Sequence, residues 1–341
     1  MKKISLIILL LSINTGFAQN TDLKNLHSKG EYNKAIELAR AMLKSTPDDF
    51  ETQLILLKIY NSRGDYQSAG LLVREMKSTD EKFLTESLKT NYGSGNIKEA
   101  KRIYDHLIKN SNNETLKNEL LKFGLIAGLD PLYNDWKIHE TESIVFHFQP
   151  SIAQEKIKHL VTSRQKAFDN INNFFNATLP KKIDFFVWDT EESYNSSLKT
   201  NLGFTVAQFC VSHNRINQSP GHEIAHNISF WKNPQLKKAR FINEGIGVCF
   251  DGQENNRLEA AGKVYRKNSV NIKEIWTSQT KIEENILYPI AGTFVDYLIQ
   301  YDKEKFLRLA EDQTFESAQQ IYAGNLNELI NNFIKTLEQP K

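Results

Sequence analysis

The chain has 341 residues, of which 40% are apolar and 25% charged, and 43 basic residues nearly balance 41 acidic ones. The sequence has neither a basic stripe nor an alternation of basic and aromatic residues, so nucleic acid and anionic membranes are not predicted partners. A chain of this length predicts two domains rather than one.

The first 18 residues have the pattern of a secretory signal peptide. Lys2 and Lys3 precede an apolar run over residues 4–13, and a small-residue cleavage site ends at Ala18. The apolar run is too short to span a bilayer as a stable helix, and no later segment is apolar enough to span one. We expect an exported, soluble protein, periplasmic or secreted, with no membrane span. Its net charge is zero because Lys2 and Lys3 leave with the signal peptide.

Residues 19–135 are predicted to form helical repeats. The sequence GEYNKA at 30–35 recurs as GDYQSA at 64–69, 34 residues later, and GNIKEA follows at 95–100. This period is that of the tetratricopeptide repeat, which the segment resembles. In such a repeat the glycine ends one helix and the alanine lets the next helix approach closely. The repeats would present a surface to a protein partner, or alternatively serve as a spacer that positions the second domain.

The second domain, residues 136–341, is predicted to be α+β. A strand is expected at 144–148, where apolar residues alternate before Pro150, and a second strand at 183–188, with a helix over 152–175 between them. A third strand is expected at 206–211, and the chain after it is predicted to be helical. The result is a small sheet packed beside a mostly helical C-terminal part.

The most informative motif is HEIAH, which begins at His222 and ends at His226. On a helix, two histidines four residues apart share a face and can hold one zinc ion, while Glu223 reaches a water bound to that metal. Ser219 is expected to cap the helix. Glu244, in an Asn-Glu-Gly setting, is expected to supply the third ligand from a second helix, which leaves one zinc position open, as in catalytic sites. The alternative is a surface helix with two unrelated histidines.

HEIAH at 222–226 followed by FINEG at 241–245 resembles the gluzincin zinc metallopeptidases, particularly the peptidase-MA-like group. The resemblance covers roughly residues 140–335 and implies a zincin-like fold. It also implies that the two histidines and Glu244 bind Zn²⁺ and that Glu223 is the general base. The implied function is hydrolysis of peptide bonds in a peptide or protein substrate through a zinc-activated water. The alternative is a catalytically silent zinc-binding protein that binds partners through its repeats.

The same resemblance suggests roles for three further residues. Tyr288 is implied as a donor to the oxyanion, with a core tyrosine as the alternative. Asp251, seven residues after the glutamate ligand, is implied to lie on the same helix face and to accept the second N–H of a zinc-bound imidazole. Asn243 would brace the ligand, or else simply lie at the helix end. The segment 208–213 lacks the acidic residue with which related aminopeptidases bind a free amine, so aminopeptidase activity is not supported.

The chain has two cysteines, Cys210 and Cys249, and both flank the zinc motifs. Export permits a disulfide between them, and the alternative is two buried thiols. His213 is close to the motif in sequence but has no partner at metal-ligand spacing. We interpret it as a structural histidine.

Overall fold

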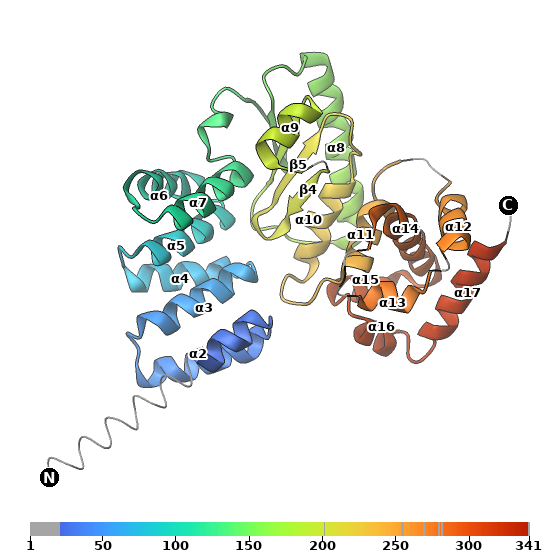
Figure 1. Ribbon diagram of the computed structural model, residues 1–341, viewed down its shortest axis with the longest axis horizontal. Coiled ribbons are helices and arrows are strands. Elements are labelled where there is room, and N and C mark those ends of the chain that lie inside the picture. The colour runs from blue at the N-terminus through green and yellow to red at the C-terminus, as the bar shows by residue number, and fades with distance from the viewer. Residues whose placement is uncertain are drawn as a thin grey trace, which may run out of the picture. The chain divides into compact units, whose positions relative to one another are not determined.

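The computed structural model describes residues 21–200, 202–253, 256–268, 270–278, 280 and 282–339. The expected signal peptide lies outside these residues. The described chain is mostly helical with one small mixed sheet (Figure 1). It divides into two compact units, a helical unit up to Gly124 and a mixed unit from Leu125 onward. Within the described ranges, none of the helices has both the length and the apolar character that a membrane crossing requires.

The helical unit consists of consecutive helices joined by short turns. After a helical stretch over 21–28, its labelled helices are α2 (Tyr32–Ser45), α3 (Phe50–Ser62), α4 (Tyr66–Met76), α5 (Glu81–Gly93), α6 (Ile97–Asn110) and α7 (Glu114–Ala127). The glycine before α2, α4 and α6 has a left-handed φ of 70°, 67° and 84° at Gly30, Gly64 and Gly95. The alanine in each of these helices is fully buried, at Ala35, Ala69 and Ala100.

These local features match the roles expected of the glycine and alanine in each segment. A left-handed residue ends a helix without steric cost only where it is glycine, and a fully buried alanine allows two helices to approach closely. Assignment of the helices to the tetratricopeptide family stays a prediction.

The mixed unit contains a five-stranded sheet with the order β1-β2-β3-β5-β4. The strands are β1 (Lys137–Glu140), β2 (Ile144–Phe148), β3 (Ile183–Trp188), β4 (Phe204–Val206) and β5 (Val211–Arg215). β2, β3 and β5 run parallel, and β1 and β4 are antiparallel edge strands. The predicted strands at 144–148 and 183–188 are therefore confirmed. So is the helix between them, which is α8 (Gln154–Phe175).

The single strand predicted at 206–211 is wrong. A 3₁₀ turn, η2 (Ala207–Phe209), interrupts the apolar run, and Cys210 has a left-handed φ of 51°. The chain reverses there, so β4 and β5 form a hairpin in which Phe204 pairs with His213 and Thr205 with Ser212. Successive side chains of a strand point to opposite faces, so these two pairs lie on different sides of the sheet.

A stack of four rings crosses one face of the sheet. The ring centroids of His147 and Phe186 are 4.3 Å apart, those of Phe186 and His213 4.5 Å, and those of His213 and Phe204 4.9 Å. Trp188 Nε1 donates to His213 Nδ1 over 3.2 Å, so Nε2 carries the proton and donates to the Ile126 carbonyl at 2.9 Å. Burial lowers the pKa of His213 to about 3. The expectation of a structural histidine is confirmed.

Two helices contact the opposite face of the sheet. In α8, the buried Arg164 guanidinium lies 5.5 Å from the centre of the Phe185 ring. From α10 (His222–Lys232), Asn227 donates to Ser212 Oγ over 2.7 Å. This face therefore positions the helix that carries the HEIAH motif.

The chain beyond the sheet is helical in its described residues, as predicted. The helices after α10 are α11 (Arg240–Cys249), α12 (Arg257–Asn268), α13 (Ile272–Thr277), α14 (Glu284–Tyr301), α15 (Lys303–Glu311), α16 (Phe315–Ile321) and α17 (Leu326–Glu338). Phe294 of α14 is central to their core, with ring centroids of Phe241, Trp276 and Phe333 at 5.6, 5.8 and 5.0 Å. A Cβ on Gly245 would lie 2.6 Å from the Ala291 carbonyl oxygen, so glycine permits α11 and α14 to pack closely.

Candidate metal centre

The start of α10 lies against the end of α11. The helix begins at His222 with Gly221 as its N-cap and no side-chain cap, so the expected cap at Ser219 is wrong. Gly221 N–H donates to the Asp251 carbonyl over 3.2 Å, and a Cβ at Gly221 would lie only 1.9 Å from the Phe250 carbonyl oxygen. Glycine is required at this position because the two backbones are nearly in contact. This contact brings the HEIAH motif close to α11.

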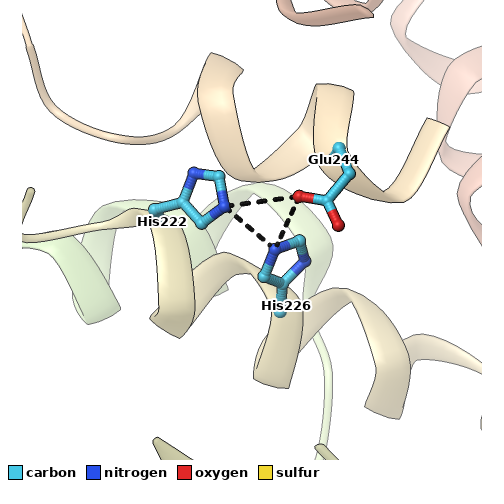
Figure 2. Close-up of side chains that lie close together, drawn as sticks. All are labelled: His222, His226 and Glu244. Atoms are coloured by element: carbon cyan, nitrogen blue, oxygen red, sulfur yellow. Dashed lines mark hydrogen bonds and ion pairs between the residues drawn. The ribbon is translucent and has the colours of Figure 1, made fainter. Parts of the chain in front are cut away.

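Three potential ligand atoms converge between these helices (Figure 2). The Nε2 atoms of His222 and His226 are 3.1 Å apart, and each lies 3.6 Å from Glu244 Oε2. Among the described residues, they form the only group of three or more His, Cys, Asp or Glu side chains arranged to hold a metal ion. A tetrahedral zinc ion, with bonds of about 2.0–2.1 Å, separates its ligand atoms by about 3.3 Å. The observed spacing and the nitrogen and carboxylate donors therefore suit a bound metal ion.

A second glycine of α11 makes room for the first histidine. A Cβ on Gly247 would lie 2.7–3.0 Å from three atoms of the His222 ring, closer than ordinary van der Waals contact. The ring therefore packs directly on the α11 backbone three residues beyond Glu244. Gly247 was not among the residues predicted from the sequence. The available signal was the second glycine in the run Glu244-Gly245-Ile246-Gly247, since glycine is unfavourable inside a helix unless close packing requires it.

The charges of the three side chains depend on one another. Burial alone would raise the pKa of Glu244, but its contacts with the two imidazoles outweigh this and lower it. For His226, burial acts to lower the pKa, whereas the Glu244 carboxylate, Glu223 and the Asn243 side chain raise it, and the net shift is upward. Asn243 also lines the cleft, and its role in bracing the ligand stays a prediction.

Glu223 lies deep in the same cleft. Its side chain is buried, and its Oε2 accepts a hydrogen bond from Thr205 Oγ1 at 2.8 Å. Thr205 could not be selected from the sequence, because the predicted strand began one residue after it. Only the hairpin brings β4 against the first turn of α10.

Tyr288 also faces the metal centre. It lies on α14, half-buried, with its ring centroid 5.7 Å from that of His222. Burial and the nearby carboxylates of Glu244, Glu284 and Glu223 raise the pKa of its hydroxyl. The hydroxyl thus stays protonated and can donate a hydrogen bond. Because the side chain lines the cleft, Tyr288 differs from the core tyrosine considered as the alternative.

Asp251 does not lie where the sequence analysis expected it. The helix α11 ends at Cys249, so the inference that two helical turns separate Asp251 from Glu244 is wrong. Asp251 Oδ1 accepts hydrogen bonds from Arg257 Nη2 and from the Gln253 N–H, both at 2.7 Å. Its contribution to the site comes through its backbone carbonyl, which accepts from Gly221 at the start of α10.

The two cysteines are free thiols in the structure. Cys210 is fully buried and Cys249 partly buried. Burial raises the pKa of both thiols to about 12. The structure therefore has the buried thiols rather than the disulfide.

The metal centre opens into a cleft of about 360 Å³. Besides the site residues, its lining comprises Gly203, Phe204, Thr205, Ala207, Gln208, Phe230 and Lys238. Lys238 connects the loop between α10 and α11 to the end of α15. Its Nζ donates to three backbone carbonyls, those of Asn233 at 3.1 Å, Ala310 at 3.1 Å and Glu311 at 2.6 Å. Burial lowers the pKa of its ammonium group to about 8.

The cleft combines a set of metal ligands, a buried carboxylate and a protonated tyrosine hydroxyl. Such a combination can activate water, accept its proton and donate a hydrogen bond to a polarised carbonyl. No protein-family model matches this chain, and no match is found among curated proteins.

Proposed function

We propose that the mixed unit is a zinc-dependent metallopeptidase of the gluzincin type. The observation that carries this proposal is the convergence of His222, His226 and Glu244 in an open cleft that also contains Glu223. Two histidines and one glutamate form a set typical of catalytic zinc, because the fourth position is left for water or substrate. The separations of 3.1, 3.6 and 3.6 Å between the ligand atoms support zinc as the metal.

Each side chain around the metal centre has a separate role in peptide hydrolysis. Zinc held by the three ligands would supply a Lewis acid and lower the pKa of a bound water. Glu223 takes the proton from the attacking water and passes it to the leaving nitrogen. Tyr288 donates a hydrogen bond to the carbonyl oxygen of the substrate as negative charge develops there.

The sheet edge supports an extended peptide as the substrate. β4 is an end strand of the sheet, and the residues from Gly203 to Gln208 that line the cleft belong to this strand or adjoin it. An end strand offers backbone N–H and C=O groups to a peptide that adds as a further strand. We also propose that the protein is exported and that its helical unit binds a protein partner.

The test is cleavage of a diverse peptide library by zinc-loaded protein lacking the expected signal peptide, read by mass spectrometry. Glu223→Gln is the inactive variant, and Glu316→Gln, on an exposed side chain of α16, is the matched control. We expect cleavage by the wild type and by the control, and none by Glu223→Gln. The cut positions distinguish an endopeptidase from an exopeptidase.

Two results would contradict the proposal. Substantial cleavage by Glu223→Gln would remove the general base from the mechanism. Stoichiometric zinc without any cleavage would instead favour the catalytically silent protein, and the partner of the helical unit would then be the next target.

A further inference from the structure

The hairpin β4–β5 places two hydroxyl groups against the first turn of α10. Thr205 and Ser212 are directly opposite each other across the hairpin, with their Oγ atoms 2.9 Å apart. Their strand neighbours Phe204 and His213 belong to the ring stack on the other face. The alternation of the two strands thus directs both hydroxyls toward Glu223.

In the hydrogen bonds that join Asn227, Ser212 and Thr205, each residue donates to the next one. Asn227 Nδ2 contacts Ser212 Oγ at 2.7 Å and the Glu223 backbone carbonyl at 3.2 Å, and a carbonyl can only accept, so this atom is the amide nitrogen. Ser212 therefore accepts from Asn227, and its own proton is directed to Thr205, since its other acceptor, the Glu223 carbonyl, is at 3.5 Å.

Thr205 continues this chain of hydrogen bonds by donating its hydroxyl proton to Glu223, the proposed general base. Its single proton has two acceptors on Glu223, the carboxylate Oε2 at 2.8 Å and the backbone carbonyl at 3.0 Å. The carboxylate is the stronger acceptor because it is charged. A chain of three donors, from Asn227 through Ser212 and Thr205, therefore ends on one oxygen of Glu223.

Burial strengthens this chain. Ser212 and Asn227 are fully buried and Glu223 is 7% exposed, and hydrogen bonds that are shielded from water polarise one another. The second carboxylate oxygen, Oε1, faces Gly203, where a Cβ would lie 2.8 Å away. The same position lies 2.3 Å from Asn214 Oδ1 and 3.0 Å from Gln218 Oε1, so any larger residue there would crowd Oε1. One oxygen of the carboxylate, Oε2, is thus held by Thr205, which leaves Oε1 to receive a proton.

We propose that Thr205 is a positioning residue for Glu223. With Ser212 and Asn227 behind it, its hydroxyl fixes the carboxylate so that Oε1 is the oxygen that receives the proton of the attacking water. The catalytic part of this inference rests on the proposed peptidase function. The hydrogen-bond chain itself does not, and it can be tested without any activity.

The activity test compares two substitutions at one position. Thr205→Val removes the hydroxyl at constant shape, and we expect kcat to fall about 10–100-fold, with KM and zinc content unchanged. Thr205→Ser keeps the hydroxyl and should retain kcat within a few-fold. Thr293→Val removes a hydroxyl that is bonded to the Arg257 carbonyl outside the cleft and serves as the control. Wild-type kcat in Thr205→Val, or a Thr205→Ser variant as slow as Thr205→Val, would overturn the proposal.

The second test measures stability in zinc-free protein. Thr205→Val should lower the Tm of the wild type by about 2–4 °C or more. The effect should be smaller in a Glu223→Ala background, because the carboxylate is then absent and only the backbone carbonyl of residue 223 remains to accept from Thr205. Equal Tm shifts in the two backgrounds would show that Thr205 does not donate to the Glu223 carboxylate. If the wild type cleaves nothing, the proposed function fails. The comparison of Tm shifts would still decide whether Thr205 holds the Glu223 carboxylate.

Discussion

Substitution of Gly247 by alanine should weaken metal binding more than it weakens the fold. The added Cβ would lie 2.7 Å from the nearest atom of the His222 ring, whereas ordinary contact begins at 3.4 Å, so the ring must move by about 0.7 Å. Functional geometry tolerates displacements of about 0.5 Å. We therefore expect zinc affinity to fall by about 100-fold, at the upper end of what lost support of a ligand costs.

The effect on stability combines two opposing terms. Alanine is better than glycine inside a helix by about 1 kcal/mol, and overpacking costs about 1–3 kcal/mol, so the net destabilisation is about 0–2 kcal/mol. Gly70, inside α4, is the matched control because a Cβ there meets nothing within 4 Å. Gly70→Ala should raise the free energy of unfolding by about 1 kcal/mol and leave zinc affinity unchanged.

The assay is competition for zinc with a chromophoric chelator, combined with denaturant unfolding of the metal-free proteins. Zinc binding by Gly247→Ala as tight as that of the wild type would contradict this prediction. Equal stabilisation of both glycine variants would contradict it as well, since no steric conflict would then exist at His222.

Further outcomes follow from other parts of the mixed unit. Zinc at 100 times its Kd should raise the free energy of unfolding by about 2.7 kcal/mol in thermal scans, and chelator or His226→Ala should remove this gain. His213 has a pKa of about 3 when folded and about 6.5 when unfolded. Between these values only the unfolded state binds the proton, so acidification from pH 6.5 should cost up to about 1.4 kcal/mol per pH unit. In denaturant titrations at several pH values, the free energy of unfolding of His213→Phe should depend less steeply on pH. Tyr288→Phe should lower kcat by about 100-fold in steady-state assays. Cys210 and Cys249 should resist alkylation until the protein unfolds, as read by intact mass.

The parts that were predictable from sequence are those that depend on neighbours along the chain. The spacing of His222 and His226 and the Asn-Glu-Gly setting of Glu244 are local patterns, and the structure brings these three side chains together. The apolar runs at 144–148 and 183–188 likewise identified two strands with their bounds. Helical or strand periodicity is sufficient in such cases because one element carries the whole signal.

Features that depend on contacts between distant segments were missed. The hairpin turn at Cys210 is hidden in an apolar run without glycine or proline, so it reads as a continuous strand. Gly221 replaces Ser219 as the helix cap because of the Phe250 backbone, 29 residues later in the chain. The end of α11 at Cys249 likewise displaces Asp251 from the face expected from helical spacing. The helix cap at Gly221 is thus set by tertiary packing, whereas Gly252, with a left-handed φ of 78°, follows the end of α11 as a local signal.

The connection made by Lys238 has a consequence for how this part of the sequence can vary. Its three acceptors are main-chain carbonyls, which are present whatever side chains occupy positions 233, 310 and 311. A substitution at any of these positions therefore leaves the three acceptors in place, whereas position 238 requires a long side chain with several donors. Deep mutational scanning should show position 238 to be intolerant because its donors are lost, and position 310 to be intolerant only of larger side chains, because Ala310 is fully buried. Co-variation between residue identities would not detect a connection whose acceptors are all main-chain atoms.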